Sequence, residues 1–201
     1  MERFTLLDAV AVPIALANID TDQIIPARFL RKPRQEGLGQ FLFHDLRFLD
    51  DGRERPDFVL NLAPYRAARI LVADRNFGCG SSREYAVLAL CHYGIRAVIA
   101  PSFGDIFFNN CFKNGLLPIV LAEAEAGALR AQIAARPGAQ VAIELAAQSV
   151  TFPDGKSHAF AIDGFRKHCL FEGIDELEFT LGQAEAIADF EACQAAEMPW
   201  L

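Results

Sequence analysis

The feature that most constrains the fold is an alternation of short apolar runs with helix-like segments between residues 70 and 135. The apolar runs lie at 70–73, 97–100 and 117–121. Segments with helical spacing of apolar residues follow them at 82–93, 105–113 and 122–135. A strand, a helix and a second strand of these lengths form a parallel pair with a right-handed crossover. The alternation therefore predicts an α/β fold built on parallel strands.

The segments on either side of this unit predict further strands, among them a pair joined by a short turn. Residues 4–17 are typical of one or two strands broken at Pro13, and 141–152 and 158–162 of two strands joined by a turn at 153–155. A short helix is expected at 165–171, and an alanine-rich amphipathic helix at 180–195 with Thr180 as its candidate cap. We therefore expect a mixed sheet in a single domain, residues 1–201, with a C-terminal helical tail from about residue 180.

The charge balance argues against several classes of partner. Nineteen basic and 26 acidic residues give a formal net charge of −7, which disfavours binding to nucleic acid or to anionic membranes. No apolar run approaches the roughly 20 residues that span a bilayer, and residues 1–8 lack the apolar core of a signal peptide. A cytoplasmic location is expected.

The cysteines argue against a metal site on this chain. They are five in number and far apart: Cys79, Cys91, Cys111, Cys169 and Cys193. No C-x-x-C pair is present, so neither a zinc site nor a self-contained iron–sulfur site is supported. Free thiols in a reducing compartment are expected.

The run NFGCGSSRE at residues 76–84 carries most of the functional information. It lies between a predicted strand and a predicted helix. Unpaired N–H groups and the helix dipole favour an anion at a helix start. Ser81, Ser82 and Arg83 add two hydroxyls and a guanidinium there. The run therefore predicts a site for a carboxylate or a phosphate.

Common glycine-loop motifs do not describe this run. A dinucleotide-binding fingerprint needs a small residue where Arg83 stands, a Walker A loop needs Gly-Lys-Ser/Thr, and a nucleophile elbow needs Gly-x-Ser-x-Gly. A hydrolase using one of the four histidines, or using Cys79 as nucleophile, stays open, although a packed structural thiol is favoured for Cys79.

The ordered set of motifs along the chain resembles the swivelling domain of the aconitase superfamily, and within it the small subunits of 3-isopropylmalate dehydratase. The motifs are NIDTDQIIP at 18–26, NFGCGSSRE at 76–84, APSFGDIF at 100–107, GLLP at 115–118 and IDGFRKH at 162–168. The resemblance implies a three-layer β/β/α swivelling domain with mixed sheets. Tyr85 and Arg75 depart from the family pattern, in which histidine and an acidic residue are expected.

The resemblance also implies a reaction. Such enzymes move water between adjacent carbons, and a [4Fe–4S] cluster acts as Lewis acid on the departing hydroxyl. Since this chain lacks grouped cysteines, the resemblance implies that the cluster lies on a partner large subunit. The implied activity is interconversion of 2-isopropylmalate and 3-isopropylmalate in leucine biosynthesis, with a 2-alkylmalate as substrate.

The roles implied by the resemblance follow the motifs residue by residue. Ser81 is the implied base that takes a proton from carbon. Ser82 and Arg83 are implied to bind a substrate carboxylate, Arg83 through two parallel hydrogen bonds. Thr21 and Asp22 match a threonine–aspartate element near the cleft and are implied to bind substrate.

A mobile loop at residues 31–40 is implied to recognise the variable group of the substrate. Its candidate residues, with those that follow, are Arg31, Lys32, Arg34, Leu38 and Phe41. Leu38 and the apolar residues 41–43 are suited to an isopropyl group, whereas the three cations leave the preference open.

Simpler interpretations remain for each of these features. The two serines are suited to helix capping, Thr21 and Asp22 to a local turn, and residues 31–40 to a solvated connection. Beyond them, alternative functions are the same chemistry on methylmalate, citraconate or homoaconitate, and an anion-binding module without catalysis.

Overall fold

A mixed sheet forms the centre of the protein. The computed structural model describes residues 1–33, 37–198 and 200. Among these residues, seven strands are arranged in the order β4-β3-β2-β1-β5-β6-β7. Their bounds are β1 (Leu6–Pro13), β2 (Ile70–Val72), β3 (Ala97–Ala100), β4 (Leu117–Val120), β5 (Gln140–Glu144), β6 (Ser149–Thr151) and β7 (Ser157–Ala159). Strands β1 to β4 pair in parallel, and β1, β5, β6 and β7 pair antiparallel. The predicted α/β fold with a mixed sheet is confirmed.

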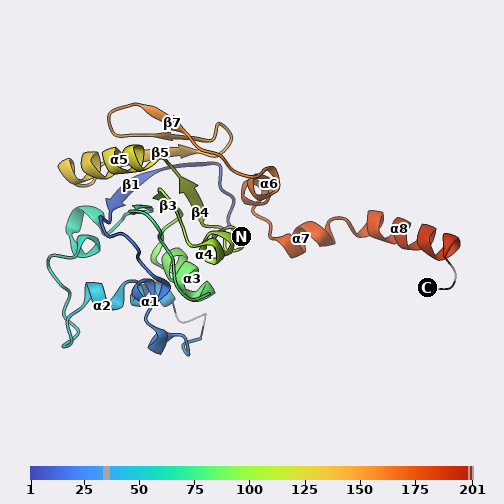
Figure 1. The fold of residues 1–201 in the computed structure, drawn as a ribbon, viewed down its shortest axis with the longest axis horizontal. Helices are drawn as coiled ribbons and strands as arrows, with labels where there is room; N and C mark the ends of the chain where they lie inside the picture. Colours follow the sequence, from blue (N-terminus) through green and yellow to red (C-terminus); the bar gives the residue numbers. More distant parts are fainter. Residues whose placement is uncertain (34–36, 199, 201) are drawn as a thin grey trace.

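The helices connect and cover these strands (Figure 1). Their bounds are α1 (Thr21–Ile24), α2 (His44–Arg47), α3 (Glu84–Tyr93), α4 (Asp105–Lys113), α5 (Glu123–Ala135), α6 (Gly164–Glu172), α7 (Glu176–Leu181) and α8 (Ala184–Glu197). Short 3₁₀ turns η1 (Ala27–Phe29), η3 (Leu38–Phe41), η4 (Val59–Asn61) and η5 (Ala63–Tyr65) lie between β1 and β2. Among the described helices, none has the length and apolar character needed to cross a membrane.

The parallel half of the sheet is buried, as its apolar runs predict. Every residue of β2 and β3 is buried. In Figure 1, α5 lies on one side of these strands and α3 and α4 on the other. Continuous apolar runs are required where helices cover both faces of parallel strands. The β2–α3–β3–α4–β4 unit therefore forms as its sequence predicts.

Helix α5 holds the two halves of the sheet together. One side of it packs against β1, β2 and β3. Its other contacts reach the β6–β7 hairpin: Gln132 Nε2 donates to Asp154 Oδ2 at 3.1 Å, and Arg136 Nη2 donates to the carbonyl of Pro153 at 3.0 Å. The sheet therefore curls over α5, which places α5 between two β segments.

Two expected elements are wrong in their boundaries. Residues 141–152 form β5 and β6 rather than one strand, because a turn at 145–148 with Gln148 at φ 53° reverses the chain. Residues 180–195 do not form one helix. Gly182 ends α7 and α8 starts at Ala184; Thr180 lies in the last turn of α7, where its hydroxyl donates to the carbonyl of Glu176, so it caps nothing.

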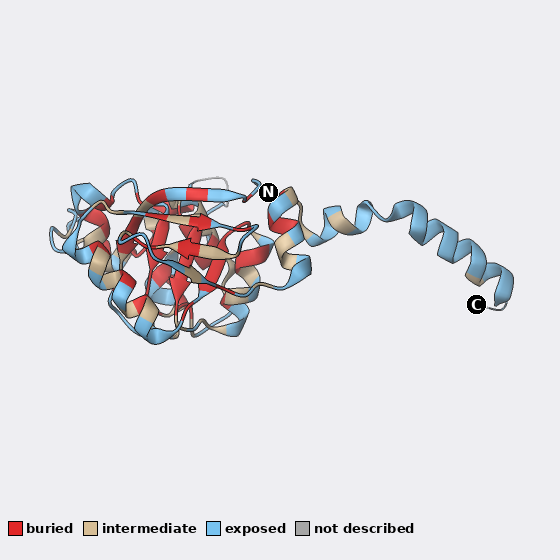
Figure 2. Cartoon of the chain, turned by 90° about the horizontal axis from the view of Figure 1, so that it is seen from above, coloured by how far each residue is buried: buried red, intermediate tan, exposed pale blue. Residues whose placement is uncertain are grey.

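The last two helices form an arm that projects from the body of the protein (Figure 2). No described residue of α7 or α8 is buried. The expected C-terminal helical tail is therefore present, and we call residues 175–198 and 200 the arm.

The segment before α2 is docked closely on α3. A Cβ atom at Gly39 would lie 2.5 Å from the backbone carbon of His92 and 2.5 Å from the nitrogen of Tyr93. The backbone of Leu38 donates to His92 Nδ1 at 3.2 Å. Only glycine permits this approach, because backbone atoms cannot move aside as a flexible side chain does.

Gly39→Ala is expected to lower the free energy of unfolding by about 1–3 kcal/mol, because the added methyl group overpacks this contact. Gly164→Ala is the matched control, since a Cβ there meets open space and φ is not positive; its effect should stay within about 0.5 kcal/mol or be stabilising. Denaturant unfolding of both variants measures this. Equal effects would show that η3 is not packed on α3 as described.

Candidate active site

The candidate site forms where the loops after β1 and β2 meet. The strands are parallel neighbours, so their carboxyl ends lie at the same edge of the sheet, where open α/β sheets bind ligands. The loops continue the pairing beyond the strands: Gly78 N donates to Ile19 O at 2.7 Å, and Thr21 N donates to Cys79 O at 3.0 Å. Residues 18–26 and 76–84, far apart in sequence, are thereby joined.

A third loop, after β3, supports this pair. Phe77 N donates to Ser102 O at 3.0 Å, and Gly104 N donates to Phe77 O at 2.9 Å. Gly78 has φ 73°, and a Cβ there would lie 2.2 Å from the ring of Phe107. The glycine is therefore required both for its backbone conformation and for the close ring.

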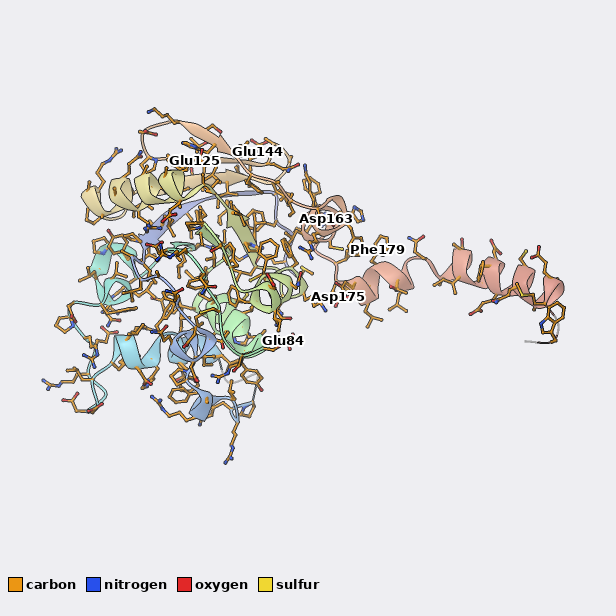
Figure 3. All side chains as sticks on the ribbon, viewed as in Figure 1. Glu84, Glu125, Glu144, Asp163, Asp175 and Phe179 are labelled. Atoms are coloured by element: carbon orange, nitrogen blue, oxygen red, sulfur yellow. The ribbon has the colours of Figure 1, made fainter. Side chains whose placement is uncertain are left out.

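Ser81 and Ser82 lie exposed on this framework. Helix α3 begins at Glu84 (labelled in Figure 3), its N-cap is Arg83, and no side chain caps it. The capping interpretation of the two serines is therefore wrong. Within the described part of the chain, neither hydroxyl has a hydrogen-bond partner. Both are accessible to a ligand beside the helix start.

Thr21 holds the backbone of Ser81. The threonine is only 2% exposed, and its hydroxyl donates to the carbonyl of Ser81 at 2.9 Å. The Thr21 hydroxyl is buried and its hydrogen is already used in this bond, so it does not face a ligand. Thr21 therefore positions Ser81 instead of contacting the substrate, as the resemblance had implied.

Arg83 and Asp22 form a bidentate ion pair. Arg83 Nη2 donates to Asp22 Oδ2 at 2.9 Å, and Nη1 donates to Oδ1. The pair holds the pKa of Asp22 below its ordinary value, chiefly through the Arg83 hydrogen bonds, and raises the pKa of Arg83. Asp22 Oδ1 also accepts from Ala27 N at 2.9 Å. Since a guanidinium has five N–H donors, this arrangement orients Arg83 and leaves donors for a second carboxylate.

The predicted recognition loop is only partly placed near the site. Arg31 and Lys32 are exposed, and Arg34 lies outside the described residues. Leu38 is fully buried against α3, so its expected contact with substrate is wrong for this conformation. Phe41 is half-buried and stacks on Phe29 with ring centroids 4.3 Å apart. Leu42 and Phe43 are fully buried core residues, not an apolar wall for substrate.

The departures from the family pattern lie beside the site. Tyr85 Oη donates to the carbonyl of Lys32 at 3.3 Å, which ties the loop to α3. The Arg75 side chain is exposed, and its Nη1 lies 3.8 Å from Glu123 Oε1.

The hydrolase interpretation finds no support in the geometry. Burial, and then the charge of Asp20, raise the pKa of the Cys79 thiol, which disfavours a nucleophilic thiolate. The histidines have other contacts: His44 with Arg28, His92 with Leu38 N, His158 with Glu125, and His168 with Phe179. In the described ranges, no three His, Cys, Asp or Glu side chains are grouped to hold a metal ion.

The sequence interpretation missed Asn18 and Asp20. Asn18 has φ 57° and accepts at Oδ1 from Asn76 Nδ2 at 2.9 Å, and Asn76 also has positive φ. The Asp20 side chain caps α1 by accepting from Gln23 N at 2.8 Å, and Gln23 Oε1 accepts from Asp20 N at 3.0 Å. The Asp-x-x-Gln spacing is the available signal for this capping box.

An open polar pocket of about 390 Å³ adjoins the ion pair. It is lined by Asp20, Asp22, Gln23, Pro26, Ala27, Arg28, Asp45 and Leu46. Arg28 in this lining is paired with Asp45, as Arg83 is with Asp22. The anion site at Ser81, Ser82 and Arg83 therefore stays a prediction.

The mixed sheet and its covering helices define a swivelling domain of the aconitase type. The aconitase C-terminal domain family matches residues 1–124, and the family described as LeuD_N matches 122–164. The family of the C-terminal domain of 3-isopropylmalate dehydratase small subunits matches 179–201. Among relatives, a 3-isopropylmalate dehydratase small subunit of Rhodospirillum rubrum is 52% identical over 201 residues, covering all of this chain and 97% of the relative. A 3-isopropylmalate dehydratase small subunit of Rhodospirillum centenum is 54% identical over 200 residues, and the match covers 100% of this chain and 98% of the relative.

A solved structure agrees with these matches. The 3-isopropylmalate dehydratase (leuD) of Methanocaldococcus jannaschii has a TM-score of 0.66 and 26% identity, and the match covers 92% of this chain and 99% of that one. The chain belongs to the family of 3-isopropylmalate dehydratase small subunits. The implied family and fold are confirmed; the roles of individual site residues stay predictions.

Asp22→Asn is expected to lower the free energy of unfolding at pH 7 by about 1 kcal/mol or less, because Asp22 is half exposed. The pKa of Asp22 is lower in the folded than in the unfolded protein, so its contribution is full above the unfolded value of 3.8 and is lost as pH falls through the folded pKa. The difference between wild type and variant should therefore shrink as pH falls below 3.8. Unfolding measured from pH 7 to pH 3 tests this, with exposed Asp57→Asn as control; a pH-independent difference contradicts the ion pair.

Proposed function

We propose that this chain is the small subunit of a hydro-lyase that interconverts 2-isopropylmalate and 3-isopropylmalate in leucine biosynthesis. The observation that carries the proposal is the Ser81-Ser82-Arg83 segment, in which both serines are exposed and the Arg83 side chain is held by Asp22. Family membership gives the reaction class, and the open pocket beside the ion pair agrees with a site shared between two subunits. A cytoplasmic location is part of this proposal.

Ser81 is proposed as the base of the dehydration. Its oxygen takes a proton from the carbon next to a carboxylate, hydroxide leaves the adjacent carbon, and a carbon–carbon double bond forms. Water then adds with the positions of proton and hydroxyl exchanged. A serine oxygen needs strong stabilisation as an anion, and the uncapped α3 N-terminus and the Arg83 guanidinium lie beside it in the chain.

Arg83 and Ser82 are proposed to bind a substrate carboxylate. The guanidinium is already oriented by Asp22, so less side-chain freedom is lost on binding. The proposed [4Fe–4S] cluster belongs to the large subunit, where it would act as Lewis acid on the departing hydroxyl. The described residues of this chain do not fit such a cluster, because the cysteines of this chain are not grouped in space.

The candidate recognition loop is proposed to face the variable group of the substrate. Because Leu38 lies in the core, the described recognition candidates that are not fully buried are Arg31, Lys32 and Phe41. Methylmalate, citraconate or homoaconitate are therefore retained as alternative substrates, and a non-catalytic anion-binding module as an alternative function. An anaerobic assay of the chain with its large subunit on a panel of 2-alkylmalates distinguishes these, because a non-catalytic module turns over none of them.

Ser81→Ala is expected to lower kcat in the reconstituted complex by about 10³-fold or more, since the base is removed. Folding and association should be unchanged because the hydroxyl makes no hydrogen bond to a described residue. Ser157→Ala, at an exposed serine in β7, is the control and should keep full activity. Near-normal turnover of Ser81→Ala would exclude its role as base.

Arg83→Lys is expected to raise KM about 10-fold and to lower kcat, because an ammonium cannot make two parallel hydrogen bonds to a carboxylate. Arg69→Lys is the control: it precedes β2, at the opposite end of the strand from the site. Steady-state kinetics with 2-isopropylmalate gives both constants. Unchanged kinetics of Arg83→Lys would contradict the carboxylate assignment.

A further inference from the structure

The arm leaves the body from a fixed position. The ring of Phe179 packs edge-on against Phe165, with centroids 4.9 Å apart, and contacts His168 (Phe179 is labelled in Figure 3). Just before the arm, the N-terminal amine of Met1 donates to the carbonyl of Gly173 at 2.8 Å. The root of the arm is thus held by α6 and by the chain start.

Beyond this root the arm has no partner within the described residues, although it carries large apolar side chains. Those exposed are Leu177, Leu181, Ile187, Phe190, Met198 and Trp200. Ile187 and Phe190 lie on one side of α8 by their i, i+3 spacing, and Phe190 is 67% exposed. Isolated helices of about 14 residues are marginal in water. Helix α8, with its 14 residues, therefore gains from docking on another surface.

The arm also carries the net charge of the protein. All 19 lysines and arginines lie in residues 1–174, together with 19 of the 26 acidic residues. The other seven acidic residues lie in 175–201, where no basic residue is present. The body is close to neutral, and the arm is an acidic helix pair with apolar side chains.

We propose that the arm docks on the large subunit, in an apolar groove rimmed by basic side chains. A second copy of this chain is a poor occupant, because two arms repel each other and the near-neutral body offers no complementary charge. The family matches agree: residues 1–124 match the aconitase C-terminal domain, whereas 179–201 match a domain named for the small subunit. The segment outside the aconitase match is therefore suited to holding a separate subunit.

The proposal rests on the proposed function, since it requires a large subunit, so the test measures binding rather than turnover. The Kd of the full-length chain for the purified large subunit is measured for wild type, Ile187→Ser and Phe190→Ser by calorimetry at two salt concentrations. Each substitution should raise Kd about 10-fold or more if these side chains are anchors. Leu6→Ser, at a leucine of the body with similar exposure (64%), should leave Kd unchanged.

A charge variant tests the electrostatic part. Glu185→Gln combined with Asp189→Asn should slow association and reduce its salt dependence. If wild type binds and the arm variants bind equally well, or if Leu6→Ser weakens binding as much, the arm proposal is overturned while the proposed function stands. If wild type does not bind the large subunit, the proposed function itself fails. Sedimentation of the chain alone completes the test: a dimer weakened by Phe190→Ser would identify a second copy as the occupant and overturn the proposal.

Discussion

The structure of the site depends on the backbone pairing between the loops that follow β1 and β2. Two hydrogen bonds, Gly78 to Ile19 and Thr21 to Cys79, extend the parallel sheet beyond the ends of its strands. The predicted site residues are attached to this extension: Thr21 fixes the carbonyl of Ser81, and Asp22 fixes the guanidinium of Arg83. Because their backbone is attached to buried strands and to Thr21, the serines are positioned although their hydroxyls make no hydrogen bond to a described residue.

Asp22 has two opposing effects on a ligand at Arg83. It holds the guanidinium in place, which reduces the entropy lost on binding, and it adds a negative charge where a substrate carboxylate is proposed to bind. The second effect is limited because Asp22 is half exposed and is already compensated by the ion pair. The remaining repulsion must be offset by positive groups or a metal centre on the other wall. This is a physical reason for a site that works only when another protein chain closes it.

Local patterns explain which parts of the fold could be predicted. The runs at 70–73, 97–100 and 117–121 are apolar throughout because helices cover both faces of the strands. Gly94 ends α3 at positive φ. Each of these signals depends only on residues that are neighbours in the sequence. The turn at 145–148 lacks glycine and proline, and was missed for that reason. The site was predicted as a loop, but Arg83 and Asp22 are 61 residues apart. Their pairing follows only from the order of strands, which no local pattern states, and the burial of Leu38 likewise follows from the close approach at Gly39.

The separation of charge along the chain connects the body to the arm. A near-neutral body does not repel an acidic substrate strongly, and the local field at the site is then set by Arg83 and by the helix start rather than by the net charge of the molecule. An acidic arm held away from the site would attract a basic partner surface without adding negative charge beside Ser81. Salt screens exposed charges that lie more than about 10 Å apart. The proposed recruitment of the large subunit by the arm is therefore compatible with the proposed binding of an anion at Arg83.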